Sequence, residues 1–110
     1  MPIRVLVADD SAIVRRAICQ TLEDDTEIQV VGETTDFAST ILRANELNPE
    51  IIVLDLHMPD DSTVVSESFR SELTNDCRII AVSFANDAET NTLARSIEAN
   101  VLLEKMKMAS

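Results

Sequence analysis

The sequence predicts a doubly wound α/β fold, in which helices cover both faces of a five-stranded parallel sheet. Five short apolar segments alternate with four helical ones, an order typical of parallel strands joined by right-handed crossovers. Residues 51–54 are apolar at every position, which favours a strand buried on both faces in the middle of the sheet. No repeat, linker or low-complexity tract interrupts this alternation, so we expect residues 1–110 to form one domain.

The first half of the chain is expected to supply two strands and two helices. The first strand runs from Ile3 to Ala8, and a helix follows from an N-cap at Ser11 to about Glu23. A second strand at 28–31 is closed by Gly32, and a second helix, capped by Thr35 or Asp36, ends at Asn48 and Pro49. Apolar residues at helical spacing predict the inward faces: Ile13, Val14, Ala17, Ile18 and Leu22 in the first helix, and Phe37, Ile41, Leu42 and Ala44 in the second.

The second half adds three strands and two helices. The central strand at 51–55 ends in Asp55, and a third helix follows a cap at Ser62 or Thr63, carries Val65, Phe69 and Leu73, and ends at Asn75 and Asp76. A strand at 78–82 closes on Ser83, a fourth helix runs from Asn86 or Asp87 to Ala99, and the last strand is 101–103. A five-stranded sheet of this kind needs a fifth helix to cover one face beside the first helix. Because only Met106 to Ser110 follow Lys105, we expect that helix to be truncated or absent. A partly bare sheet face would favour a homodimer.

The charge and the cysteines narrow the class of protein. Twenty acidic against nine basic residues give a net charge of −11, so we expect this segment not to bind nucleic acid directly, and a metal ion or a cationic partner fits better. Cys19 and Cys77 form no metal-ligand spacing and are expected to be buried thiols of a reducing compartment. Without a signal peptide or an apolar run of membrane length, we expect a cytoplasmic protein that does not contact a membrane.

Polar residues follow most of the predicted strands at the point where each ends. They are Asp9, Asp10, Asp55, Ser83 and Lys105, and parallel strands would bring them to one edge of the sheet. Three carboxylates in one cleft need a cation to offset their repulsion, and Mg²⁺ suits oxygen ligands. A hydroxyl and an ammonium group could then hold a phosphoryl group, which predicts phosphoryl transfer onto a carboxylate with Asp55 as nucleophile.

These residues resemble the receiver domain of two-component response regulators. The resemblance rests on Asp9 and Asp10 in VLVADDS, Asp55 in IIVLDLHMP, Ser83 in IIAVSFAND and Lys105 in LLEKM. It covers essentially the whole chain, from Ile3 to Lys107. It implies a flavodoxin-like strand order 2-1-3-4-5 and phosphorylation of Asp55 by a sensor histidine kinase or phosphotransfer protein. It also implies Mg²⁺ bound by Asp9, Asp10, Asp55 and the main-chain carbonyl of His57, with Ser83 and Lys105 on the phosphoryl oxygens. The phosphate would switch binding of a partner or attached effector.

Several residues depart from the usual pattern of the family. None of them is a phosphoryl-transfer group, so they affect the surface that a partner would bind more than the transfer reaction. Phe84 stands where a small residue is common and could restrict phosphodonors, Leu102 replaces an aromatic switch residue, and Met106 replaces a proline. The side chain of His57 could tune hydrolysis or donor access. Whether a DNA-binding effector follows residue 110 stays open.

Two other functions remain open at this level. A metal-dependent phosphohydrolase would use the same aspartyl phosphate, but it usually needs an acid where His57 stands. A degenerate receiver would bind partners without phosphorylation. We therefore expect a signalling domain rather than a substrate-turnover enzyme.

Overall fold

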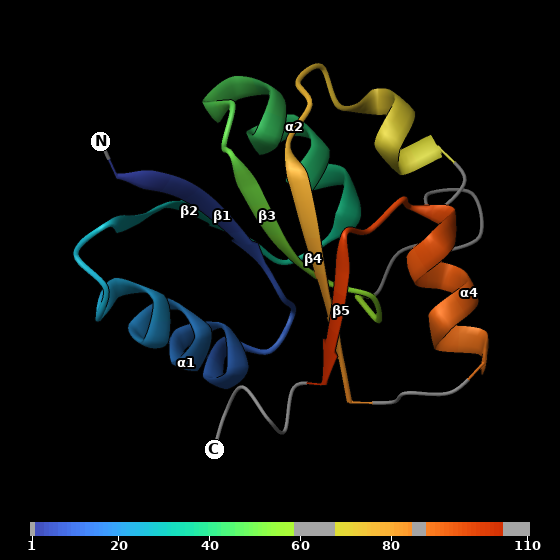
Figure 1. Cartoon of the computed structure of the whole chain (residues 1–110), viewed down its shortest axis with the longest axis horizontal. Helices are drawn as coiled ribbons and strands as arrows, with labels where there is room; N and C mark the ends of the chain where they lie inside the picture. The colour runs from blue at the N-terminus through green and yellow to red at the C-terminus, as the bar shows by residue number, and fades with distance from the viewer. Residues whose placement is uncertain (1, 59–67, 85–87, 105–110) are drawn as a thin grey trace.

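A computed structural model describes residues 2–58, 68–84 and 88–104. Within these residues one parallel sheet contains five strands in the order β2-β1-β3-β4-β5 (Figure 1). The strands are β1 (Ile3–Ala8), β2 (Ile28–Thr34), β3 (Ile51–Asp55), β4 (Arg78–Ser83) and β5 (Val101–Glu104). The helices are α1 (Ala12–Glu23), α2 (Phe37–Leu47) and α4 (Ala88–Ser96), and residues 68–72 are also helical. The predicted doubly wound fold and its strand order are confirmed.

Alternate residues of the strands face two separate hydrophobic cores. Leu6 and Ala8 of β1 pack in the larger core with residues of α2 and α4, whereas Val5 and Val7 face the smaller core on the side of α1. Figure 1 shows this division: among the helices of the described residues, α1 lies on one side of the sheet and α2 and α4 lie away from it. The central strand β3 contributes to both cores, as expected of a strand apolar on both faces.

Polar side chains fix the helix ends close to where the sequence predicts them. Ser11 caps α1 by accepting a hydrogen bond from the Val14 N–H, and Asp36 caps α2 by accepting one from the Ser39 N–H. Asn48 ends α2 in a left-handed conformation with φ of 49°. These contacts confirm Ser11 as the N-cap of α1 and show that Asp36, not Thr35, caps α2. They also confirm that α2 ends before Pro49.

The prediction that Gly32 closes the second strand is wrong, because β2 continues to Thr34. The register between β1 and β2 shifts at this point, so that Val5 pairs with Val30 but Leu6 pairs with Gly32. A Cβ atom on Gly32 would lie 3.0 Å from Leu47 Cδ1 and 3.2 Å from Leu6 Cδ1. Glycine at this position therefore permits close packing inside a strand rather than a turn.

Two apolar residues predicted to face inward are exposed instead. Ile13 of α1 is 84% exposed and Leu42 of α2 is 62% exposed. The inward stripe of α1 passes through Val14 and Ile18, one residue further along the helix, since successive residues are rotated by about 100°. In α2 the predicted inward residues Phe37 and Ala44 are buried, together with Thr40, whose Oγ1 lies 2.7 Å from Thr34 Oγ1.

The ends of the later elements differ in detail from the prediction. The third helical segment ends at residue 72 rather than at Asn75, although Phe69 and Leu73 are buried as expected. Helix α4 ends at Ser96 rather than Ala99, because Glu98 adopts a left-handed φ of 56°. The predicted caps at Ser62, Thr63, Asn86 and Asp87, the helical residue Val65, and the question of a fifth helix after Lys105 lie outside the described residues. None of the described helices has the length and apolar character needed to cross a membrane.

Candidate functional site

The strand register brings the predicted site residues to one edge of the sheet. Ala8 pairs with Leu54, so Asp9 and Asp55 follow at the same level on adjacent strands. Asp55 pairs with Val82, which places Ser83 one residue beyond it on β4. The arrangement follows from the parallel topology, which aligns the carboxyl ends of all strands.

Three carboxylates form an acidic cluster at this edge. Asp9, Asp10 and Asp55 can each offer one oxygen, and these oxygens all lie within 4.8 Å of one another. Asp9 and Asp55 are buried, whereas Asp10 is exposed, so the cluster opens to solvent on one side. Like charges at this separation repel, and a bound cation would remove the cost. The oxygen donors and their spacing fit a hard divalent ion such as Mg²⁺, whose bound form retains several waters.

Local hydrogen bonds orient the two buried carboxylates. Asp9 Oδ1 accepts from the Ser11 N–H at 2.9 Å, and Asp55 Oδ1 accepts from the His57 N–H at 2.9 Å. In both cases the donor is two residues further along the chain, the pattern of an Asx turn. Each carboxylate is thus positioned by the turn that leaves its own strand.

Arg15 is a contributor that the sequence analysis did not identify. Its guanidinium donates to the main-chain carbonyl of Asp9 at 2.8 Å and forms an ion pair with Glu33 at 2.9 Å. Arg15 comes from the first turns of α1 and Glu33 from the end of β2, so the turn carrying the acidic pair is clamped from two elements. The sequence could have indicated this role, because Arg15 lies four residues after the N-cap Ser11. That spacing is one helical turn, which places Arg15 near the acidic pair that precedes the helix.

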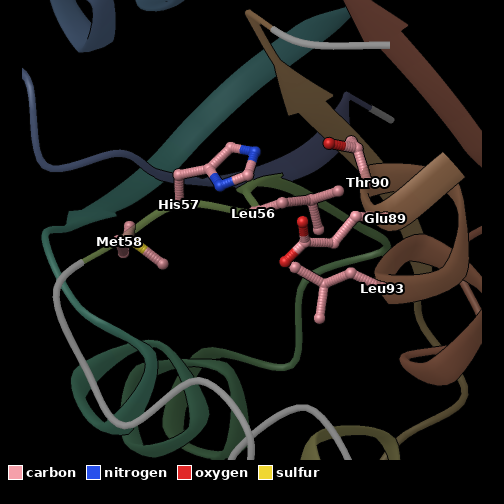
Figure 2. Close-up of a pocket in the computed structure, with 6 residues that line it drawn as sticks. All are labelled: Leu56, His57, Met58, Glu89, Thr90 and Leu93. Carbon is pink, nitrogen blue, oxygen red and sulfur yellow. The ribbon is translucent and has the colours of Figure 1, made fainter. Parts of the chain in front are cut away.

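Ser83 is fully buried, and its hydroxyl contacts the side chain of His57. The distance between His57 Nε2 and Ser83 Oγ is 2.9 Å. His57 also lines a hollow of about 250 Å³ with Leu56 and Met58 (Figure 2). In Figure 2, Glu89, Thr90 and Leu93 of α4 line the other side of the hollow. The imidazole therefore lies between the acidic edge and the start of α4.

The structure describes some of the remaining predicted residues but not others. Lys105 and Met106 lie outside the described residues, so their proposed roles stay predictions. Phe84 follows Ser83 and is 61% exposed, and Leu102 is partly buried against the larger core. Glu104, which precedes Lys105 in the sequence, pairs with Ser83 across the sheet.

The two cysteines take no part in the site. Both are buried and neither forms a disulfide, as predicted. Burial, followed by the charge of Glu33, raises the pKa of the Cys19 thiol to about 11. Burial also raises the pKa of Cys77. Both are therefore neutral apolar groups at physiological pH.

Comparison with known proteins adds independent observations. The family model described as response regulator receiver domain matches residues 5–109. The chain is 35% identical over 98 residues to a protein-glutamate methylesterase/protein-glutamine glutaminase from Syntrophomonas wolfei, covering 87% of the chain but 27% of that protein. It is 34% identical over 102 residues to the response regulator protein VraR from Staphylococcus saprophyticus, covering 92% of the chain and 47% of VraR.

A solved structure agrees with these matches. The response regulator domain of Thermotoga maritima CheB superimposes with a TM-score of 0.81 at 27% identity, covering 94% of this chain and 78% of that one. The chain thus spans less than half the length of both curated relatives.

Proposed function

The chain belongs to the receiver-domain family of response regulators, and we propose that it accepts a phosphoryl group on Asp55 in a magnesium-dependent reaction. The observation that carries this proposal is the acidic cluster, in which the oxygens of Asp9, Asp10 and Asp55 lie within 4.8 Å. Asp55 is the member at the end of the central strand, with neighbouring strands on both sides. It is therefore the carboxylate that groups on β1, β4 and β5 can surround.

The proposed reaction is a direct transfer to the carboxylate. An oxygen of Asp55 attacks the phosphorus atom, the bond from phosphorus to the donor breaks, and the donor leaves with the bonding electron pair. A phosphohistidine donor takes up a proton as imidazole, whereas acetyl phosphate leaves as acetate. The product is an acyl phosphate on Asp55.

The other site residues have supporting roles in this proposal. Asp9, Asp10, Asp55 and the main-chain carbonyl of His57 would hold Mg²⁺, which when bound neutralises charge on the phosphoryl oxygens. The Ser83 hydroxyl would donate a hydrogen bond to one phosphoryl oxygen. Lys105 would pair with another, a role supported by the pairing of its neighbour Glu104 with Ser83.

The partner that we propose is a sensor histidine kinase or a phosphotransfer protein. Such a donor must reach the acidic edge. Helix α1 begins at Ala12, two residues after Asp10, and its second residue, Ile13, is an exposed apolar side chain near that edge. Two buried thiols, Cys19 and Cys77, are consistent with a cytoplasmic location. We further propose that residues 1–110 work as a signalling domain that controls a partner or effector, without substrate turnover of their own.

A single phosphorylation experiment tests the proposal. The protein is incubated with acetyl phosphate and Mg²⁺, and its intact mass is followed over time. We expect one labile phosphate adduct that is lost in Asp55→Asn and in excess EDTA. Asp36→Asn is the matched control, because Asp36 is also a carboxylate that accepts a main-chain hydrogen bond but caps α2 outside the cluster.

Other outcomes of this experiment would contradict the proposal. An adduct that persists in Asp55→Asn would place the phosphate on another residue. Rapid consumption of many phosphomonoesters would indicate a phosphohydrolase. No adduct under any condition would indicate a module that works without phosphorylation.

A further inference from the structure

His57 connects the two groups that the proposed reaction requires. Its main-chain N–H donates to Asp55 Oδ1 at 2.9 Å, and its Nε2 lies 2.9 Å from Ser83 Oγ. The first contact holds the main chain of His57 against the carboxylate, and the second holds its ring against the hydroxyl at the end of β4. His57 therefore contacts both Asp55 and Ser83, which the pairing of β3 with β4 brings to the same edge.

The hydrogen-bonding capacity of Ser83 limits what this contact can do. A serine hydroxyl has one proton to donate and two lone pairs that accept. Phosphoryl oxygens only accept, so the Ser83 proton must point to the phosphoryl group when that group is bound. The contact with His57 can persist in that state only if Nε2 carries a proton and donates to Ser83 Oγ. The resulting chain runs from Nε2–H to the hydroxyl and from the hydroxyl to a phosphoryl oxygen.

We propose that His57 is a positioning residue, whose imidazole holds the Ser83 hydroxyl in place to bind the phosphoryl group on Asp55. This inference rests on the proposed function, because it needs a phosphoryl group at Asp55. A donor whose own position is fixed loses less conformational freedom when it binds, and the bond from Nε2 directs the only proton of Ser83 away from the ring. His57 thus acts through Ser83 rather than on the phosphoryl group itself.

Substitution of His57 is a usable test because the residue is exposed, while its neighbours Leu56 and Met58 are buried. His57→Leu removes the side-chain donor, and His57→Gln restores a donor N–H at the end of the side chain. We measure binding of beryllofluoride, a mimic of the phosphoryl group, by NMR titration in the presence of Mg²⁺. We expect His57→Leu to weaken binding about fivefold, as for loss of one hydrogen bond, and His57→Gln to recover most of it. In a Ser83→Ala background, His57→Leu should have no further effect.

Nitrogen NMR of the histidine ring gives a readout that a purely structural role would not change. In the metal-free protein, Ser83→Ala should shift the Nε2 resonance of His57, the only histidine in the chain. On beryllofluoride binding, that resonance should have the shift of a protonated nitrogen. An unprotonated Nε2 in the bound state would overturn the inference.

The binding results separate failure of this inference from failure of the proposed function. Equal or tighter beryllofluoride binding by His57→Leu, or an effect of His57→Leu that persists in Ser83→Ala, would overturn the role of His57 and leave phosphorylation of Asp55 intact. If the wild-type protein forms no adduct and binds no beryllofluoride, the proposed function fails and this inference fails with it. Thermal unfolding of each variant identifies any loss of binding caused by misfolding.

Discussion

Replacing Asp9 by asparagine should stabilise the protein when no divalent ion is present. Asp9 and Asp55 are both buried, and their carboxylate oxygens lie within 4.8 Å of each other. Two unit charges at that distance repel by about 3 kcal/mol at an effective dielectric constant of about 20. An asparagine Oδ1 can still accept from the Ser11 N–H, although a bond to a neutral acceptor is weaker by about 1 kcal/mol. We therefore expect a net gain of about 2 kcal/mol in the free energy of unfolding.

Chemical unfolding in urea, followed by circular dichroism, measures this gain in EDTA and again in Mg²⁺. The wild-type protein should gain about 2.7 kcal/mol at an ion concentration a hundred times the dissociation constant, because only the folded state presents the cluster. Asp9→Asn should gain much less. Asp36→Asn, the matched carboxylate outside the cluster, should keep the full response to Mg²⁺. A destabilised Asp9→Asn in EDTA, or an undiminished response to Mg²⁺, would refute the electrostatic reasoning.

Further predictions concern the cores and a buried thiol. Ile18→Ala should lower the free energy of unfolding in urea by about 2 to 5 kcal/mol, because Ile18 is 4% exposed. Ile13→Ala should change it by less than about 0.5 kcal/mol, because Ile13 is exposed. Similar losses for the two variants would contradict the burial of Ile18 and the exposure of Ile13. Phe69→Ala should cost about 3 to 5 kcal/mol in the same assay, since the ring is fully buried and packs edge-on against Phe37. Folding raises the pKa of the Cys19 thiol from 9.0 to about 11. Between these pH values the folded protein holds its thiol proton more tightly than the unfolded chain does, so the free energy of unfolding should fall as the pH rises from 9 to 11. Cys19→Ala should lack this slope in pH-dependent unfolding, and an equal slope in the variant would exclude the thiol as its source.

The sequence predicted features that depend on local pattern. The limits of β3 and the cap at Ser11 agree with the structure, because an apolar run and a capping hydroxyl are properties of neighbouring residues. The sequence also predicted which residues would meet at one edge of the sheet, because parallel strands align their carboxyl ends. Three of them are there in the structure: Asp9, Asp55 and Ser83.

Features that depend on distant residues could not be predicted in this way. Gly32 lies inside β2 because of a register shift against β1, and no pattern around Gly32 reports that shift. His57 and Ser83 are 26 residues apart, and their contact depends on how residues 56–58 lie against the end of β4, where the Leu56 N–H donates to the Val82 carbonyl. The bond from Arg15 to the Asp9 carbonyl depends likewise on the angle between α1 and the sheet. Lys105 lies outside the described residues, so its place in the site rests on its position directly after β5 and on the resemblance to the family.

Chemical trapping of the phosphorylated residue shows whether Asp55 is the phosphoryl acceptor. The protein is phosphorylated with acetyl phosphate and Mg²⁺, reduced with borohydride, which converts an aspartyl phosphate to homoserine, and digested for peptide mass spectrometry. We expect homoserine at position 55 alone, and none when Mg²⁺ is removed with EDTA. Homoserine at position 9 or 10, or an unmodified Asp55 in fully phosphorylated protein, would show that another residue accepts the phosphoryl group.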